Sequence, residues 1–169
     1  MAFDVKSFRR ALGTFATGVA VMTVAGRDGA SDVGITVNSF TSVSLNPPLI
    51  LVCLDRASRH AARFVTGEEF VVNVLNQEQG ATSIHFAMSA TQETWTGLAV
   101  TRTAAGTPVL GDCLAHLTCR LVAVHEGGDH DILVARVEEL EWRRDGHPLL
   151  YFRGCYGRLG DIFVPSADR

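Results

Sequence analysis

A stretch of nine residues, Thr36 to Ser44, concentrates small polar side chains in a chain otherwise rich in apolar strands. Its hydroxyl and amide groups surround one aromatic ring and can both donate and accept hydrogen bonds. If the stretch is one strand, one side carries Thr36, Asn38, Phe40, Ser42 and Ser44, and the other carries Val37, Ser39, Thr41 and Val43. A planar ligand with a polar rim would fit the first side. A solvent-facing edge strand blunted by Ser and Thr explains the composition equally well.

A second stretch whose side chains could bind a ligand, residues 55–63, overlaps the end of the apolar run LILVCLD. Its pattern predicts a short helix with Ser58 as N-cap, and the N–H groups of a helix N-terminus favour a phosphate. Arg56, Arg59 or Arg63 could add positive charge. The alternative is a simple cap, since most capping serines bind nothing. One ligand could nevertheless present its ring to the polar stretch and its phosphate to this one.

The third stretch is EGGDHDI, residues 126–132. Gly-Gly-Asp is ordinary hairpin chemistry, and His130 can be a turn residue without a role. A turn is also where a rigid scaffold places a residue that meets a transient substrate.

Other chemistries lack their signatures, because the chain has no GxGxxG, GxxxxGK[ST], HExxH or GxSxG motif. His85, His116 and His125 are scattered and fit surface or hydrogen-bonded histidines. Cys53, Cys113, Cys119 and Cys155 form no CxxC pair and are interpreted as small hydrophobes in a reducing compartment. We therefore expect no metal site.

The elements that must position these residues follow from periodicity. Phe8, Leu12 and Phe15 predict an amphipathic helix capped by Asp4 and ending near Gly18. Later segments predict strands at 18–25, 31–40, 49–55, 69–75, 113–127, 130–142 and 148–159, with short helices near 58–67 and 77–88. The strand at 49–55 is a continuous apolar run and is expected to be buried. We expect residues 90–97 to form a loop and 160–169 a loosely held tail. The pattern favours a mainly β fold, an antiparallel barrel with short helical insertions.

Length and charge restrict the function further. A chain of 169 residues predicts one domain, and a formal charge of −3 without a basic stripe argues against nucleic-acid binding. No segment approaches the roughly 18 apolar residues of a membrane span, so we expect a cytoplasmic protein without membrane contact.

Several motifs together resemble a known family. They are FRRALGTFATGVAVMT, GITVNSFTSVSLNPPLILVCL, EFVVNVLNQEQ, the HFA of residues 85–87, GGDHDI and PLLYFRGCYGRL. They are similar to the flavin reductases that form the small component of two-component flavin-dependent monooxygenases, a branch of the FMN-binding split-barrel proteins. The resemblance runs from about Phe8 to Leu159. It implies a single domain over 1–169, built as an antiparallel split β-barrel of Greek-key type.

The resemblance also implies a site and a partner. FMN, or FAD, would lie against the polar stretch with its phosphate near Cys53 to Arg59, in a pocket completed across a homodimer interface. The implied flavin-binding residues are Thr36, Val37, Asn38, Ser39, Ser42, Val43, Ser44, Cys53, Leu54, Asp55, Ser58, Arg59 and Phe86. NADH or NADPH would contact Asp129, His130 and Tyr156. The sequence departs from relatives at His60 and Arg63 and in the loop around Trp95.

The implied activity is hydride transfer from NAD(P)H to the flavin, with reduced flavin supplied to a partner monooxygenase. That transfer occurs between the two cofactors, so we expect no catalytic side chain. Two alternatives remain open. One is a same-fold enzyme that reduces a metal-corrinoid, quinone or iron complex, and the other is a flavin-binding protein without enzymatic activity.

Overall fold

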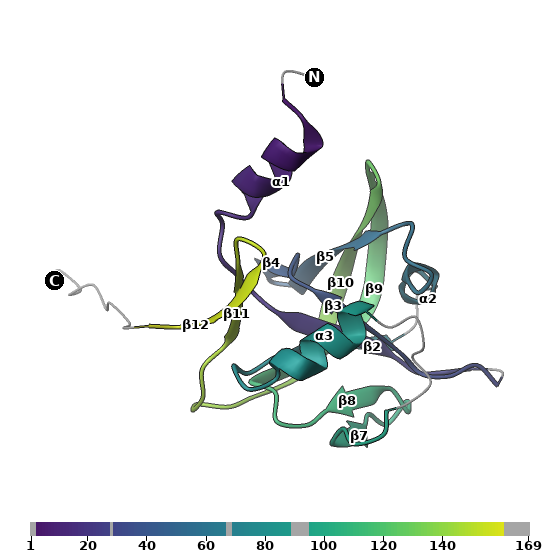
Figure 1. Ribbon diagram of the computed structural model, residues 1–169. Coiled ribbons are helices and arrows are strands. Elements are labelled where there is room, and N and C mark those ends of the chain that lie inside the picture. The colour runs from purple at the N-terminus through teal and green to yellow at the C-terminus, as the bar shows by residue number, and fades with distance from the viewer. Residues whose placement is uncertain (1–2, 28, 67–68, 89–94, 161–169) are drawn as a thin grey trace, which may run out of the picture.

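The computed structural model describes residues 3–27, 29–66, 69–88 and 95–160. Its main feature is a seven-stranded antiparallel sheet with the strand order β3-β2-β6-β9-β10-β5-β4 (Figure 1). The strands are β2 (Ala20–Val24), β3 (Val33–Val37), β4 (Thr41–Leu45), β5 (Pro48–Asp55), β6 (Glu69–Val74), β9 (Ala115–Gly127) and β10 (His130–Trp142). The mainly β, antiparallel prediction is confirmed, as is the long hairpin around the turn at Gly128.

The sheet is strongly curled. Its two edge strands, β3 and β4, are consecutive in the chain and are joined by residues 38–40 alone. Four Cα–Cα steps span at most about 14 Å, so the two edges must approach each other. Within the described part of the chain no ladder joins β3 to β4, and the sheet is therefore a barrel left open at this seam.

Thr36 to Ser44 do not form one strand, so the two faces expected of such a strand are not formed; the strand predicted at 31–40 ends at Val37, and β4 was not predicted. The chain leaves the sheet after Val37, crosses the seam, and enters β4 with a register shift between Ser42 and Ser44. As a result Val37 and Phe40 both pack in the barrel core, whereas the Thr36 hydroxyl donates to the Ser83 carbonyl of α3 (Gly80–Met88) at 2.7 Å. A strict alternation over nine residues cannot survive a crossing between two edges.

Two helices differ from their predicted ends. Helix α1 (Val5–Leu12) is capped by Asp4, as predicted, through a 2.7 Å bond from the Ser7 N–H. It ends at Leu12 and not near Gly18, because β1 (Thr17–Gly18) already pairs with β11 (Leu149–Phe152). Helix α2 (Ala61–Phe64) has His60 at its N-cap, so the Ser58 cap is wrong; the predicted end at residue 67 lies outside the described residues.

Some strands were missed or misjudged. Strands β7 (Val100–Arg102) and β8 (Pro108–Leu110) form a hairpin that no sequence pattern indicated. The predicted last strand is in fact a second hairpin, β11 with β12 (Cys155–Arg158), turned by Arg153 at φ 50° and Gly154 at φ 82°. Strand β5 alternates between buried and partly exposed residues and is not buried throughout. The predicted loop at 90–94 and tail at 161–169 lie outside the described residues.

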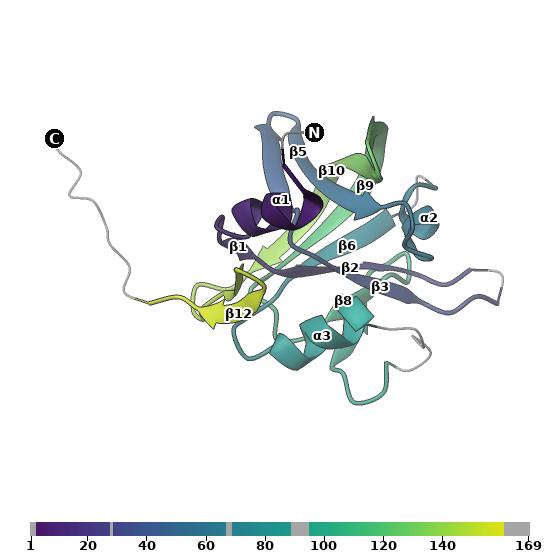
Figure 2. The same ribbon diagram turned by 45° about the horizontal axis from the view of Figure 1, so that its top comes forward.

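Apolar side chains gather on both sides of β2. Met22 points into the barrel with Val52, Phe70 and Leu133, while Val21 points to the opposite side. That second side holds a smaller cluster with members Leu75, Phe86, Leu110 and Leu149. Figure 2 shows α3 on this side and α1 on the other. No described helix is long and apolar enough to cross a membrane.

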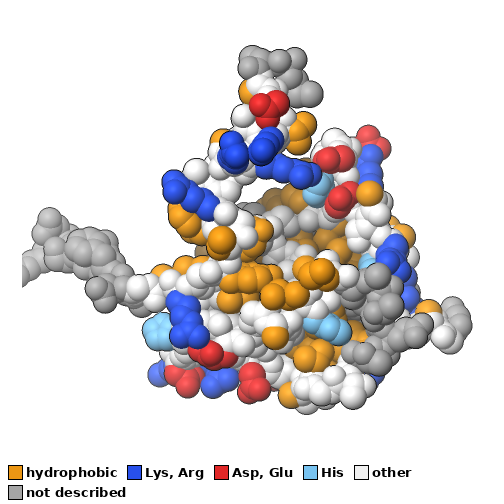
Figure 3. Space-filling view, in the orientation of Figure 1, with side chains coloured by type: hydrophobic (Ala, Val, Ile, Leu, Met, Phe, Trp, Pro, Cys, Tyr) orange, Lys and Arg blue, Asp and Glu red, His pale blue; other side chains and the backbone are white. Residues whose placement is uncertain are grey.

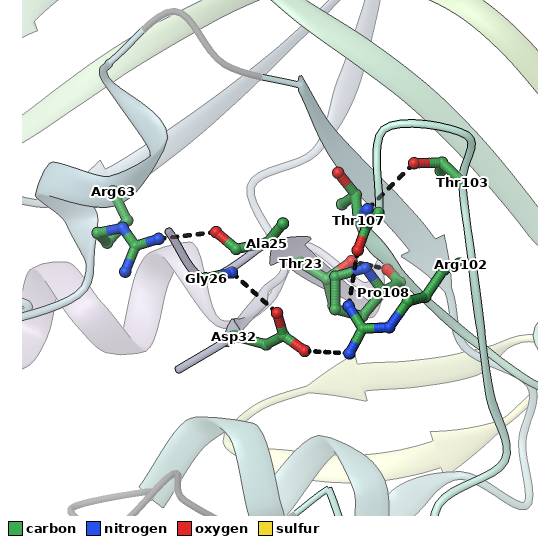
Figure 4. A network of polar contacts seen from close by, with 10 residues as sticks. Thr23, Ala25, Gly26, Asp32, Arg63, Arg102, Thr103, Thr107 and Pro108 are labelled. Atoms are coloured by element: carbon green, nitrogen blue, oxygen red, sulfur yellow. Dashed lines mark hydrogen bonds and ion pairs between the residues drawn. The ribbon is translucent and has the colours of Figure 1, made fainter. Parts of the chain in front are cut away.

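A polar network ties the β2–β3 hairpin to the β7–β8 hairpin (Figure 4). The Asp32 carboxylate accepts from the Gly26 N–H at 2.8 Å and from Arg102 Nη2 at 2.7 Å. Arg63, one turn beyond the His60 cap, donates to the Ala25 carbonyl at 2.7 Å. Burial alone would raise the pKa of Asp32, but the bonds from Arg102 and Gly26 outweigh it and hold that pKa below its ordinary value.

This network predicts an acid-sensitive contribution to stability. A carboxyl whose pKa is lowered on folding stabilises the fold above the unfolded-state pKa and loses that effect as pH falls through the folded-state value. Asp32→Asn should therefore lower the urea midpoint at neutral pH, and the gap to the parent should shrink below the ordinary Asp pKa of 3.8. Equal midpoints at neutral pH would contradict this assignment.

Candidate functional site

The structure brings part of the predicted site together in one cavity of about 480 Å³, which lies between β3, the segment joining β5 to α2, and α3. It is lined by Ile35, Thr36, Asp55, Ala57, Ser58, Arg59, His60, Phe86, Ala87 and Met88. Five of the thirteen predicted flavin-binding residues are among them. The volume is ordinary for a small-molecule or cofactor site.

Phe86 reaches this cavity because β3 carries a glycine opposite it. A Cβ built on Gly34 would lie 2.5 Å from the ring of Phe86, which is closer than two carbons can approach. Gly34 therefore lets α3 lie directly on β3, with Phe86 as a wall of the cavity. Sequence reasoning gave Gly34 no role, since the signal is a contact across the fold.

The turn after β5 is built differently from the prediction. Asp55 accepts from the Ala57 N–H at 2.8 Å through Oδ1 and from the Ser58 N–H at 3.0 Å through its carbonyl, and Ala61 N–H donates to the Ser58 carbonyl at 3.1 Å. These N–H groups are engaged within the turn and are not aimed at a ligand. The Ser58 hydroxyl and the Arg59 guanidinium are the groups of this turn best suited to an anion among the cavity-lining residues.

His60 lines this cavity and carries a buried ring nitrogen. Its Nε2 is buried and has no hydrogen-bond partner among the described residues. Burial lowers the pKa of this imidazole, and the charges of Arg59 and Arg63 lower it further. Because this nitrogen has almost no accessible surface, its lack of a partner does not show that it faces the cavity. The sequence marked His60 only as a departure from relatives.

The remaining residues predicted to bind flavin do not line the cavity. Ser39 Oγ accepts from the Cys53 N–H at 3.0 Å and donates to its carbonyl at 2.9 Å, which fastens the seam crossing to β5. Val37 and Leu54 are buried in the barrel core. Asn38, Ser42 and Val43 are exposed near the seam, and Ser44 is half-buried there.

The turn at Gly128 lies beside this cavity. In the β5–β10 ladder His130 is the partner of Asp55, and the Arg56 N–H donates to the Asp129 carbonyl at 3.1 Å. The His130 ring and the Asp129 carboxylate are 2.7 Å apart, and this hydrogen bond, with the charges of His130 and Arg9, lowers the pKa of Asp129. The predicted flavin and coenzyme regions therefore meet at the end of β5.

Tyr156 does not join His130. Its hydroxyl is 2.7 Å from Ser83 Oγ, and its ring packs edge-on against Tyr151. Because Ser83 also receives the Thr36 bond, Tyr156 is linked to α3 and β3. The role of Tyr156 toward the coenzyme stays a prediction.

Helix α1 stands away from the body, with a hollow between it and the β9–β10 hairpin (Figure 3). Its apolar residues Phe8, Leu12 and nearby Phe15 are 48%, 58% and 77% exposed. The Arg153 N–H donates to the Gly13 carbonyl at 2.8 Å and anchors its C-terminal end. A groove of about 730 Å³ lies here, lined by Val5, Lys6, Arg9, Arg10, Gly13, Thr14, Arg153 and Gly154, and it contains no residue of the predicted site.

A curled antiparallel sheet with a cofactor-sized cavity beside its open seam is the architecture of an open β-barrel with a candidate ligand-binding site. Residues 12–160 match the model of the flavin reductase like domain family. The chain therefore belongs to the flavin reductase family.

Named relatives agree with this assignment. The chain is 40% identical, over 99% of its length and 85% of the relative, to the reductase subunit HsaB of a flavin-dependent monooxygenase from Rhodococcus jostii. It is 39% identical to the FMN reductase (NADH) SmoA of Agrobacterium fabrum, over 91% of this chain and 86% of that one. The NADH:FAD oxidoreductase SgcE6 of Streptomyces globisporus, solved with NAD and FAD fragments, superposes with a TM-score of 0.84 at 33% identity, covering 98% of this chain and 96% of that one.

The contact between Gly34 and Phe86 predicts a stability and affinity effect. In Gly34→Ala the new methyl group must displace the Phe86 ring, and overpacking of this kind costs about 1–3 kcal/mol of the free energy of unfolding. We expect a lower melting temperature and weaker FMN binding, measured by thermal denaturation and flavin fluorescence.

Gly157→Ala is the matched control, because a Cβ there meets nothing within 4 Å. Adding Phe86→Leu to Gly34→Ala should restore part of the stability. If Gly34→Ala and Gly157→Ala have the same melting temperature and the same flavin affinity, neither stability nor flavin binding requires the close approach of α3 to β3.

Proposed function

We propose that this member of the family is an NADH-dependent flavin reductase that binds FMN, with FAD as an alternative, and supplies reduced flavin to a separate monooxygenase. The observation that carries the proposal is the pairing of His130 with Asp55, which sets the turn beside the cavity. Relatives named as NADH-dependent reductases and as monooxygenase reductase subunits support NADH and the oxygenase partner.

The residues of the cavity fit a flavin phosphate and ring. Ser58 and Arg59 offer a hydroxyl and a positive charge for the phosphate, while Thr36 and Phe86 offer a polar group and an apolar wall for the ring. A bound flavin supplies the atom that accepts hydride, so the chain needs only to bind and orient the two cofactors. This agrees with the expectation that no side chain acts as an acid or base.

His130 is placed to bind the nicotinamide coenzyme. Its ring donates to Asp129, which orients the imidazole at the edge of the turn. The β5–β10 ladder places His130 at the end of β5, where its partly exposed imidazole can meet a coenzyme phosphate or amide.

A second copy of the chain is the occupant we propose for the exposed face of α1. Apolar residues Phe8 and Leu12 lie uncovered on a helix that buries none of its own residues, which is unusual for a solitary chain. A homodimer would cover them. All four cysteines are free thiols, which supports the proposed cytoplasmic location. We further propose that the whole chain is a single domain.

The activity is tested with purified protein. NADH oxidation under air should require added or bound FMN, and anaerobic mixing should bleach the flavin absorbance. When a flavin-dependent oxygenase is added, the reduced flavin should support hydroxylation of the oxygenase's substrate, although the oxygenase itself does not react with NADH. Absence of NADH oxidation with any flavin would leave a flavin-binding protein without reductase activity.

A variant of Ser58 distinguishes binding of the flavin phosphate from binding of the flavin ring. Because His60 occupies the N-cap, Ser58→Ala should change the melting temperature little. It should weaken the binding of FMN by about 1.5–3 kcal/mol, the contribution of one hydrogen bond to a charged group, and leave the affinity for riboflavin unchanged. Calorimetric titration with both flavins measures the difference. Equal losses for FMN and riboflavin would remove Ser58 from the phosphate site.

His130→Ala should act on the coenzyme and not on the flavin. We expect a higher KM for NADH, with a lower kcat as well if the ring orients the coenzyme for transfer. FMN affinity should stay at the parental value. The exposed His147 provides a control variant, His147→Ala. Anaerobic stopped-flow reduction at the parental rate for all NADH concentrations would return His130 to an ordinary turn residue.

The dimer is tested by polar substitutions on α1. The double variant Phe8→Ser, Leu12→Ser should shift the protein from twice the mass of one chain to the monomer mass in light scattering. Arg10→Ser, two residues after Phe8 and exposed on the opposite side of the same helix, is the control and should stay dimeric. A monomeric parent protein would overturn this part of the proposal.

A further inference from the structure

We propose that Arg56 is a positioning residue that fixes the turn of Gly128 to His130 against the end of β5, so that the nicotinamide coenzyme is presented to the flavin cavity. This inference rests on the proposed function. The sequence suggested Arg56 as a possible phosphate ligand, but the structure directs its guanidinium to carboxylates of the hairpin, and Arg56 is absent from the lining of the cavity.

Arg56 contacts the hairpin on both sides of its turn. Its N–H donates to the Asp129 carbonyl at 3.1 Å, and its Nε donates to Asp131 Oδ1 at 2.6 Å. On the other strand, Nη2 lies 3.6 Å from Glu126 Oε1. One residue thus joins the end of β5 to β9, to the turn and to β10.

The bond to Asp131 is the main contribution of the side chain. The Asp131 side chain is only 22% exposed and that of Arg56 is 39% exposed, so their charge-assisted bond is partly shielded from water. Glu126 is 91% exposed, and an ion pair with so exposed a carboxylate contributes little.

The turn needs such a bond because the core does not hold it. Along β10 from the turn, Leu133 is the first side chain that is fully buried. His130 and its neighbour Asp129 precede it and extend beyond the packed core, with Gly128 in a left-handed conformation at φ 74°. Among the described residues, the strand pairing, the contacts of Arg56 and the nearby charge of Arg9 hold this tip, and Arg56 is the one that joins it to the end of β5.

Arg56 also follows directly after Asp55, which lines the cavity and pairs with His130. A displacement of the turn relative to β5 therefore changes the distance between the coenzyme and the cavity. The flavin-binding groups on α3 and β3 are not connected to Arg56 by any described contact and should keep their places.

The test compares four variants in the NADH:FMN assay. Arg56→Ala should raise the KM for NADH about tenfold, equivalent to about 1.4 kcal/mol, and lower kcat, with the Kd for FMN changed less than twofold. Asp131→Asn should produce the same pattern, and the double variant should be no worse than the worse single variant. Arg56→Lys should restore part of the loss. Arg158→Ala removes an arginine that forms a more exposed ion pair with Glu78, away from the turn, and is the control for loss of a surface arginine.

Three results would overturn the proposal. Parental kinetics in Arg56→Ala would show that the side chain is not needed. A loss in Arg56→Ala without one in Asp131→Asn would mean that Arg56 contacts the coenzyme itself. Unchanged hydrogen exchange of residues 127–132 in Arg56→Ala would show that the turn is held without it. This last measurement needs no activity, so it separates failure of the inference from failure of the proposed function.

Discussion

The antiparallel pairing of β5 with β10 is the interaction on which the rest of the site depends. Seven residue pairs, from Leu49 with Arg136 to Asp55 with His130, fix where the turn of the long hairpin ends. Backbone ladders of this kind tolerate no slip by one residue, since every side chain would change face. The register therefore decides that the histidine of the turn stands beside the cavity.

Around this ladder a few specific contacts fasten α3 and the seam crossing to the sheet. Thr36 and Gly34 attach α3 to β3 through a hydrogen bond and a close packing contact, and Ser39 attaches the seam crossing to β5. Each attachment joins segments far apart in the sequence. The candidate cofactor site is built from three such segments and is held by tertiary structure, and the proposed hydride transfer needs a fixed approach between two rings.

Sequence patterns predicted the parts of the fold that depend on local order. The long hairpin was found because its alternation continues over two strands around a glycine turn, and the Asp4 cap because its partner lies three residues away. The hairpin of β7 and β8 was missed because strands of three residues are too short to show a period.

The site was predicted only in outline, for a physical reason. Ser58 looked like a helix cap, but Asp55 takes the N–H groups of the turn first and moves the helix start to His60. The alternation from Thr36 to Ser44 failed because its two halves belong to opposite edges of the sheet. Which side chains share a cavity depends on register and curvature, and neither leaves a signal in a single stretch of sequence.

The central claim, that flavin and coenzyme meet at the end of β5, is tested most directly by backbone amide NMR during stepwise addition of FMN and then of oxidised NAD. FMN alone should shift the amides of Thr36, Ser58 and Arg59, and NAD added to the FMN complex should shift those of Asp129 and His130. Shifts concentrated at Lys6, Arg10 and Arg153, in the groove of α1, would contradict the account.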